Sequence, residues 1–544
     1  MSKKSIALLC AIMALGAFLR FYQITEIPPG LYPDEAMNGN NALEALATGD
    51  FKVFYPENNG REGLFINMQA ISVAAFGNTP WALRIVSALI GTLTILGIYL
   101  VARELFRSNP VGLLAAFFLA ASYWHLNFSR IGFRAIMLPM FATFGIYFLL
   151  KGLRTCKALN MIIAGTLTGL GVHTYIAFRF MVFVFAVPIV YTLWQRMRVK
   201  RSDVLSKTIA LFTLFGITFY IIAALVALAP LGFYFFQHPE AFASRAGDVS
   251  VFSSAAPAKE LLISAGKTVG MFFWNGDCNW RHNFNCRPEL NPLVAVFFVI
   301  GIIASIRAST TYKLQSTTLA VWLIAMSLPA VLTREGIPHA LRAIGMLPPV
   351  MILASLGADR VRGLITTWSA RQKTQWLTKA VQIERIRREL TVLLIAALLT
   401  VPLITYRDYF IRWADKPQTY DAFDTSSVHL GKYLAALPRE THKYIVVNRS
   451  GTLVRGIPMP AQTIIYITDT FRRESQREKN FTYIVADGTT SRAMALSDFN
   501  PPAQEKYVIA FLDGLDGDLI TAFRAKYPKL KAHAPGDFII LENQ

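Results

Sequence analysis

The sequence predicts a mostly helical, polytopic membrane protein of about eleven transmembrane helices with a small α/β domain at its C-terminal end. Three observations predict this class. Hydrophobic residues make up 54% of the chain and charged residues only 16%. Apolar runs of about 17–25 residues, the length that crosses a bilayer, alternate with short polar loops. Short β-branched and aromatic runs, which are typical of strands, gather after the last apolar run.

The first apolar run begins at about Ile6, behind Lys3 and Lys4, and its start resembles a signal peptide. No small-residue cleavage site follows it, so we interpret this run as an uncleaved first helix. The transmembrane helices are expected at about 5–24, 80–102, 110–127, 135–151, 158–175, 179–195, 208–236, 290–307, 315–333, 341–358 and 390–406.

The positive charge of the chain predicts its orientation rather than a nucleic-acid partner. The net charge is +20, but the Lys and Arg residues cluster in short loops, above all in 195–207 and 359–389. Basic loops stay in the cytoplasm. The N-terminus is therefore expected in the cytoplasm, and the loops 25–79 and 237–289 outside it. This pattern predicts a multi-pass protein of the inner (plasma) membrane.

The chain after the last span changes character. We expect a transmembrane module over 1–406 and a soluble, extracytoplasmic α/β domain over 407–544. The expected strands of this domain lie at 444–448, 463–468, 482–487, 506–512 and 538–542, and its expected helices at 426–437 and 518–527.

The first external loop opens with two adjacent carboxylates, Asp34 and Glu35, just beyond the first helix. A helical stretch is expected from about residue 36. One interpretation is that Asp34 caps this helix and that Glu35 is favoured by the helix dipole. The other is that Asp34 is a general base that removes a proton from an acceptor hydroxyl or amine. Both roles are compatible, because a capping carboxylate is well oriented.

The same loop later carries Glu57, Arg61 and Glu62 within a short, glycine-containing segment. A solvated turn is the simple explanation. The alternative is that the acidic groups bind sugar or acceptor hydroxyls and that Arg61 binds a phosphate.

Several short loops on the external side contain arginine, against the usual bias of membrane proteins. Arg130 and Arg134 share one turn, Tyr175 lies in a second, and His339 and Arg342 lie in a third. Each arginine could simply extend to the interface, as arginines near helix ends do. A guanidinium also binds phosphate through two parallel hydrogen bonds. We therefore expect Arg130, Arg134, His339 and Arg342 to recognise a lipid phosphate, and Tyr175 to bind the acceptor or the sugar.

Cysteine and metal-binding motifs give little evidence about the function. Cys278 and Cys286 lie in one external loop, where a single disulfide is conceivable. The sequence has no HExxH motif, no clustered CxxC motif and no phosphate-binding P-loop. The sequence indicates no certain cofactor and leaves a divalent metal open.

Four segments together resemble the GT-C membrane glycosyltransferases, in particular the protein O-mannosyltransferase and lipid A aminoarabinose transferase group. The segments are Pro33-Asp34-Glu35-Ala36, Gly60-Arg61-Glu62-Gly63-Leu64-Phe65, Ser129-Arg130-Ile131-Gly132-Phe133-Arg134 and His339-Ala340-Leu341-Arg342. The resemblance covers about residues 5–410.

This resemblance implies transfer of a sugar from a polyprenyl-phosphate donor on the external face, to a protein, lipid or glycan. It implies that Asp34 is the catalytic base with Glu35 beside it, and that Arg134 and Arg342 handle the phosphate. Aminoarabinose transferases carry Glu-Lys-Pro where this chain has Arg61-Glu62-Gly63. This departure weakens the inference of their lipid A specificity and of their metal site.

Two other functions compete with this one. A non-enzymatic lipid or polysaccharide transporter would carry ionisable residues deep in several helices and an internal repeat, neither of which the sequence shows clearly. A ligase that moves whole glycans would share the fold and the same residues. The sequence leaves the sugar and the acceptor open.

Overall fold

The computed structural model describes residues 2–198, 204–243, 250–254, 256–308, 310–375, 379–485, 499, 506–514 and 516–543. The chain divides into two compact units. The membrane unit comprises Met1–Tyr22 and Ser87–Trp413, and the second unit comprises Gln23–Val86 and Ala414–Gln544. The predicted first external loop, residues 25–79, thus shares a unit with the C-terminal tail.

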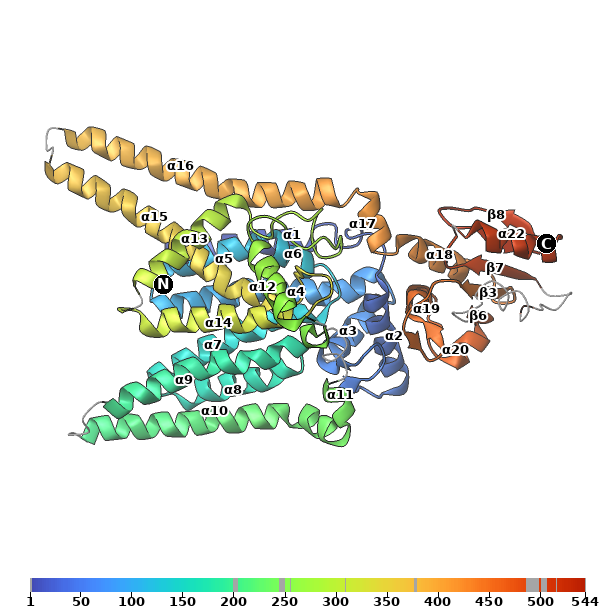
Figure 1. Cartoon of the computed structure of the whole chain (residues 1–544), viewed down its shortest axis with the longest axis horizontal. Coiled ribbons are helices and arrows are strands. Elements are labelled where there is room, and N and C mark those ends of the chain that lie inside the picture. The colour runs from blue at the N-terminus through green and yellow to red at the C-terminus, as the bar shows by residue number, and fades with distance from the viewer. Residues whose placement is uncertain are drawn as a thin grey trace. The chain divides into compact units, whose positions relative to one another are not determined.

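Helices build the membrane unit, and the long ones lie side by side (Figure 1). They are α1 (Lys3–Phe21), α4 (Pro80–Phe106, whose first residues belong to the second unit), α5 (Asn109–Ala120), α6 (Tyr123–Phe128), α7 (Met137–Thr155), α8 (Ala158–Val172), α9 (Met181–Arg198), α10 (Val204–Gln237), α11 (Pro239–Ala243), α12 (Pro257–Gly270), α13 (Pro292–Arg307), α14 (Lys313–Val331), α15 (Leu347–Gln375) and α16 (Ala380–Tyr406). Short helical turns precede or follow several of them: η1 (Arg134–Ile136), η2 (Ile176–Phe180), η3 (Val251–Ser253), η4 (Ile344–Met346) and η6 (Arg407–Trp413).

The predicted fold class is confirmed. Among the described residues, 8 helices are long and apolar enough to cross a membrane. The shorter apolar helices α5, α8 and α13 coincide with the three remaining predicted spans. Each predicted span therefore corresponds to an apolar helix.

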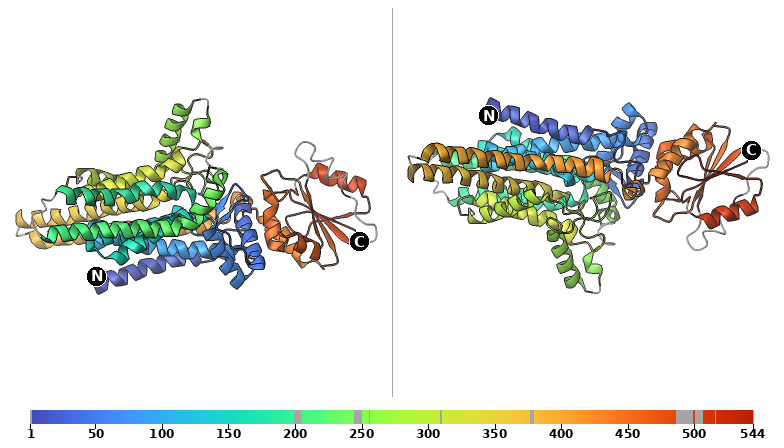
Figure 2. Two further views of the ribbon diagram at one scale, coloured as in Figure 1. Left: turned by 90° about the horizontal axis from the view of Figure 1, so that it is seen from below. Right: turned by 90° about the horizontal axis from the view of Figure 1, so that it is seen from above.

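Two parts of the predicted helical pattern were wrong. The span expected at 110–127 is two helices, because the chain breaks after α5 and the Ser122 hydroxyl caps α6 by accepting from the His125 amide. The loop expected at 359–389 is mostly helical, because α15 and α16 continue into it as an antiparallel pair (Figure 2). Charge pairs one turn apart support these extensions, such as Arg362 with Asp359. Lys200 and Arg201 of the other basic loop lie outside the described residues.

The C-terminal part of the second unit is built on a five-stranded sheet with the order β6-β3-β7-β9-β8. The strands are β3 (His442–Val447), β6 (Phe481–Val485), β7 (Tyr507–Phe511), β8 (Lys531–His533) and β9 (Ile540–Glu542). The strands β6, β3 and β7 are parallel, and β9 and β8 are antiparallel to their neighbours.

Helices cover both faces of this sheet (Figure 2). Alternate residues of β3 point to opposite faces. Ile445 and Val447 pack in the core with α18 (Thr425–Ala436) and α19 (Gln462–Thr468), and Val446 packs in the core with α22 (Gly517–Lys526). Smaller elements complete this part: α17 (Pro417–Ala422), β4 (Leu453–Val454), β5 (Ile457–Pro458), η7 (Met459–Ala461) and α20 (Arg473–Glu478).

Four of the five predicted strands are confirmed, although residues 486 and 487 of the third lie outside the described part of the chain. The remaining strand prediction, 463–468, was wrong, because this segment forms the helix α19. Its run of β-branched residues is apolar on every side, and periodicity alone does not separate a buried strand from a short buried helix. In the helix, Ile464 and Ile465 are both buried in the core against the sheet, and this packing stabilises the helical conformation.

The predicted first external loop forms α2 (Pro33–Thr48), the short strands β1 (Phe54–Tyr55) and β2 (Arg61–Glu62), and α3 (Gly63–Phe76), a helix that was not predicted. Met37 of α2 joins the core of the C-terminal sheet. Ala36 and Tyr466 belong to a second buried cluster, which links α2 to α19. These contacts fix the start of α2, where the two predicted carboxylates lie.

Candidate active-site residues

Asp34 and Glu35 both lie in the first turn of α2. Pro33 begins this helix, and proline suits that position because it lacks the amide hydrogen that would be left unsatisfied there. The two carboxylates then differ in environment: Glu35 is buried, whereas Asp34 stays partly accessible. Of the two, Asp34 is the carboxylate that a reactant can approach.

A turn from the same loop fixes the Asp34 side chain. The strands β1 and β2 pair as an antiparallel hairpin, and Asn58, Asn59 and Gly60 at its tip all have positive φ. The Asn58 side-chain amide donates to Asp34 Oδ1 at 2.7 Å. The structure therefore brings together two motifs of the first external loop that are separate in the sequence.

Glu35 forms a buried ion pair with Arg84, at the start of α4. Arg84 Nε lies 3.0 Å from Glu35 Oε2, and Arg84 Nη2 lies 3.1 Å from Glu35 Oε1. The same guanidinium donates to the carbonyls of Pro28 and Gly30, at 2.6 and 2.8 Å. Arg84 thus holds Glu35 and the chain that leads into α2. Arg84 was not predicted as a functional residue, because it lies within a predicted apolar span.

Arg61, predicted to bind phosphate, is buried against α2. Its guanidinium donates to Asn38 Oδ1 at 2.6 Å, to Asn41 Oδ1, and to the Glu57 carbonyl at 3.4 Å. The neighbouring Glu62, predicted to bind sugar or acceptor, is also buried. These contacts hold the hairpin against α2.

Glu57, also predicted to bind sugar or acceptor, faces the C-terminal part of the unit. Its carboxylate pairs with Arg455 at 3.1 Å, and Arg455 also forms two contacts of 2.8 Å with Glu44. The hydrogen bonds to Glu44 and then to Glu57 raise the pKa of Arg455 above its already high value. Glu57 of the hairpin and Glu44 of α2 are thus both paired with an arginine that lies far away in the sequence.

In the membrane unit, the structure brings together Arg134 and Tyr175, two of the predicted residues. The Arg134 guanidinium lies 5.7 Å from the centroid of the Tyr175 ring, a cation–π distance.

Arg342 Nη1 donates to the Glu335 carbonyl at 2.9 Å, and its backbone amide donates to His339 Nδ1 at 3.4 Å. Both arginine side chains are partly accessible.

Arg130 is in a different environment. It is fully buried, and its Nη1 donates to the carbonyls of Leu19 and Arg20, at 3.1 and 2.8 Å. Its guanidinium also lies over the rings of Tyr409 and Phe410. Carbonyls at a helix C-terminus have no partner within the helix, and Arg130 supplies one for α1.

His339 meets two residues that the sequence analysis did not single out, Asp277 and His282. The His282 Nδ1 and Asp277 Oδ2 atoms are 2.8 Å apart, and His339 Nδ1 lies 3.9 Å from the same oxygen. Asp277 and His282 belong to the loop between α12 and α13, and His339 to the segment between α14 and α15. Because Asp277 and His282 lie far from His339 in the sequence and form no local motif with it, no sequence signal pointed to these two residues.

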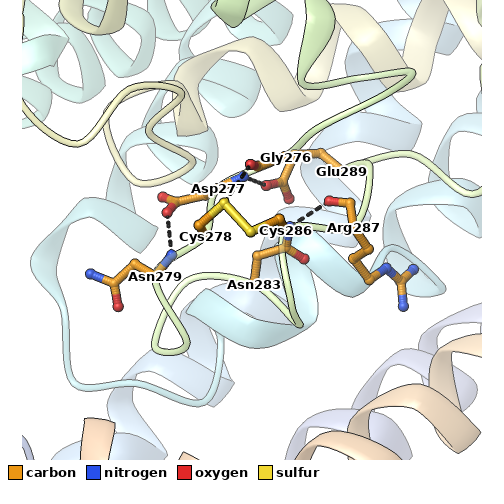
Figure 3. The surroundings of a disulfide bond; sticks show 8 residues. All are labelled: Gly276, Asp277, Cys278, Asn279, Asn283, Cys286, Arg287 and Glu289. Atoms are coloured by element: carbon orange, nitrogen blue, oxygen red, sulfur yellow. Dashed lines mark hydrogen bonds between the residues drawn. A yellow bond between two sulfur atoms is a disulfide. The ribbon is translucent and has the colours of Figure 1, made fainter. Parts of the chain in front are cut away.

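A disulfide holds the loop that carries Asp277 and His282. Cys278 and Cys286 are bonded (Figure 3), as the sequence analysis had considered. Next to this disulfide, the Asp277 amide donates to Glu289 Oε1 at 3.1 Å. Burial raises the pKa of Glu289 well above its usual range.

Comparisons with known proteins agree on the fold. Residues 64–226 match the family model described as dolichyl-phosphate-mannose-protein mannosyltransferase. ArnT from Cupriavidus metallidurans bound to undecaprenyl phosphate aligns with a TM-score of 0.56 at 13% identity, over 100% of this chain and 99% of that chain. Its apo state gives a TM-score of 0.55 at 13% identity, over 99% and 98% of the two chains. No curated protein sequence matches this chain.

Proposed function

We propose that this chain, which has the GT-C fold of membrane glycosyltransferases, transfers a sugar from a polyprenyl-phosphate donor to an acceptor, with Asp34 as general base. The reaction takes place on the extracytoplasmic face of the inner membrane, and the acceptor is a protein, lipid or glycan. The fold and the family match at 64–226 support the reaction class. The undecaprenyl phosphate bound to ArnT supports the class of donor.

The observation that carries the proposal is the position of the Asp34 carboxylate, which is both held by a hydrogen bond and accessible. One oxygen is fixed by the Asn58 amide at 2.7 Å, and the side chain remains partly accessible at the first turn of α2. A general base must be oriented toward the proton that it takes and must be open to the reactant. Asp34 meets both requirements, whereas Glu35 is enclosed by Arg84.

In this mechanism the acceptor oxygen or nitrogen attacks the anomeric carbon of the sugar. The bond between that carbon and the phosphate oxygen breaks, and the lipid phosphate leaves with the bonding electrons. Asp34 takes the proton of the acceptor. Arg134 and Arg342 bind the donor phosphate and stabilise the negative charge that develops on it. Five further residues act as positioning residues, because the contacts given above tie each of them into its own unit or bury it. They are Arg130, Arg61, Glu35, Glu57 and Glu62.

The test combines a donor panel with a matched pair of variants. Purified protein is incubated with radiolabelled polyprenyl-phosphate sugars, and the released or transferred sugar is identified. Asp34→Asn should lower turnover with the productive donor roughly 10²- to 10⁴-fold, the usual contribution of a general base. Asp50→Asn removes an exposed carboxylate from the same loop and should leave turnover unchanged. Near-normal turnover of Asp34→Asn would remove this residue from the mechanism, and a protein inactive toward every donor would remove the proposed reaction.

A further inference from the structure

Three side chains of the membrane unit with metal-ligating groups converge at one point. The nitrogen and oxygen atoms of Asp277, His282 and His339 lie within 4.8 Å of one another. The centroids of the two imidazole rings are 4.9 Å apart. Imidazole nitrogen and carboxylate oxygen are the donors that bind first-row divalent metals.

The cluster is also shielded from solvent. The side chains of His282 and Asp277 are 6% and 4% exposed, and that of His339 is 15% exposed. A buried carboxylate needs a compensating positive charge. The nearby Arg287 does not supply it, because this arginine pairs with Asp408 at 2.7 Å.

The backbone around the three residues is held in place before any ion binds. Asp277 Oδ1 accepts from the Asn279 amide at 2.8 Å, and Asp277 Oδ2 accepts from the Ala340 amide at 2.9 Å. The second contact joins the two loops directly beside His339. The Cys278–Cys286 disulfide directly follows Asp277 and closes the loop that contains His282 (Figure 3).

We propose that Asp277, His282 and His339 bind one first-row divalent metal ion of the zinc class. Two nitrogens and one oxygen disfavour calcium and magnesium, which prefer sites made of oxygen alone. Three protein ligands also leave a fourth position for water or for an anionic oxygen.

The distances indicate how the cluster adjusts to the ion. Zinc bonds of about 2.0–2.1 Å in a tetrahedral site place neighbouring ligand atoms about 3.3 Å apart. The His339 Nδ1 to Asp277 Oδ2 distance of 3.9 Å therefore shortens. The His282 Nδ1 to Asp277 Oδ2 distance of 2.8 Å lengthens as the metal replaces the shared proton. Both changes amount to about half an ångström, and the ligand atoms of His282 and His339, which lie within 4.8 Å of each other, approach to the same spacing.

The first test is metal content and affinity of the full chain, purified in detergent with a histidine-free affinity tag. We expect about one equivalent of bound metal by elemental analysis, and saturable Zn²⁺ binding after chelation. Co²⁺ substitution should give the visible absorption of a four-coordinate ion. His282→Gln and His339→Gln should each weaken Zn²⁺ binding at least tenfold. The exposed His238 lies outside the cluster, and His238→Gln should not change the affinity.

A second measurement uses the unmutated chain, so that a folding defect in a variant does not decide the matter. Zn²⁺ should protect His339 from diethyl pyrocarbonate, as followed by peptide mass spectrometry, whereas His238 should react equally with and without the ion. The proposal would be overturned if the chain showed no saturable Zn²⁺ binding, if both cluster variants bound Zn²⁺ as tightly as the unmutated chain, or if Zn²⁺ did not protect His339. None of these readouts uses transferase activity, so failure of the Asp34 mechanism leaves this test intact.

Discussion

Glu35 and Arg84 form a fully buried, two-point ion pair that joins the start of α2 to the start of α4. The side chains of Arg84 and Glu35 are 2% and 0% exposed, and both guanidinium–carboxylate contacts are about 3 Å long. Glu35 is adjacent to the proposed base but does not face a reactant. Its effect on transfer is therefore expected to act through the position and stability of α2.

Replacing one partner of this pair should destabilise the second unit. Glu35→Gln leaves the Arg84 charge buried without its carboxylate, which costs about 3–5 kcal/mol in comparable cases. For a unit of this size, that cost corresponds to a fall in melting temperature of roughly 6–20 °C. Scanning fluorimetry in detergent measures it, and Glu26→Gln, an exposed glutamate of the same segment, is the control.

A second variant separates positioning from chemistry. The double variant Glu35→Gln/Arg84→Met removes both charges and should lose less stability than the sum of the single variants, because neither charge remains buried alone. A Glu35→Gln protein with an unchanged melting temperature and strongly reduced turnover would assign Glu35 to the chemistry and contradict its role as a positioning residue.

The start of α2 illustrates what the sequence determines. Pro33 followed by two acidic residues is a local helix-start signal. The helix was expected from about residue 36 but begins at Pro33, so the cap position belongs to Tyr32 and the predicted capping role of Asp34 was wrong. The partner of Glu35 was not predictable, because Arg84 lies 49 positions further along the chain within an apolar run. Hydropathy assigns such a run to a membrane span and does not distinguish a single buried cation near its end.

The same limit applies to the two loops of the metal cluster. His339 was singled out because it lies beside Arg342, in a loop that carries unexpected charge. Asp277 and His282 gave no signal, because metal motifs that are recognisable in sequence require ligands at short, regular spacing. For 463–468 the sequence misled, because a short buried helix and a buried strand share the same apolar composition.

The disulfide gives the third testable prediction. Under denaturing conditions without reductant, alkylation should modify only Cys10 and Cys156, since Cys278 and Cys286 are bonded to each other. Reduction first should expose all four thiols, and the intact mass distinguishes the two results. Cys278→Ser/Cys286→Ser should lose about 2.5 kcal/mol of stability, the value for closing so short a loop. Labelling of four thiols without reductant would show that this bond does not form in the protein.

Membrane orientation is tested by single cysteines at exposed positions. They are introduced into a chain that lacks the free Cys10 and Cys156 and keeps the bonded Cys278–Cys286 pair. An impermeant maleimide added outside spheroplasts should label Asp50→Cys, Ser253→Cys and Thr521→Cys. It should miss Thr374→Cys in the basic α15–α16 region until the cells are opened, because basic segments stay in the cytoplasm. Labelling of Thr374→Cys in closed spheroplasts would reverse the proposed orientation.

The last prediction concerns Arg134 and Arg342, and it separates phosphate binding from anchoring at the membrane interface. Lysine keeps the charge and reaches the interface but lacks the planar, two-point donor of arginine. If the two arginines bind the donor phosphate, Arg134→Lys and Arg342→Lys should each lower kcat/KM for the donor about 10- to 100-fold. This corresponds to the loss of a hydrogen bond to a charged group, about 1.5–3 kcal/mol.

Arg179 provides the matched control, because its guanidinium lies 4.1 Å from the Phe242 ring centroid and its Nη1 donates to the Phe242 carbonyl at 3.0 Å. It has no part in the proposed mechanism, so Arg179→Lys should leave donor kinetics nearly unchanged. The losses at Arg134 and Arg342 should depend on the donor and be the same for different acceptors, since the phosphate belongs to the donor alone. Unchanged donor kinetics in both lysine variants would show that these arginines only anchor the chain, and phosphate recognition would then have to come from other cations of the membrane unit.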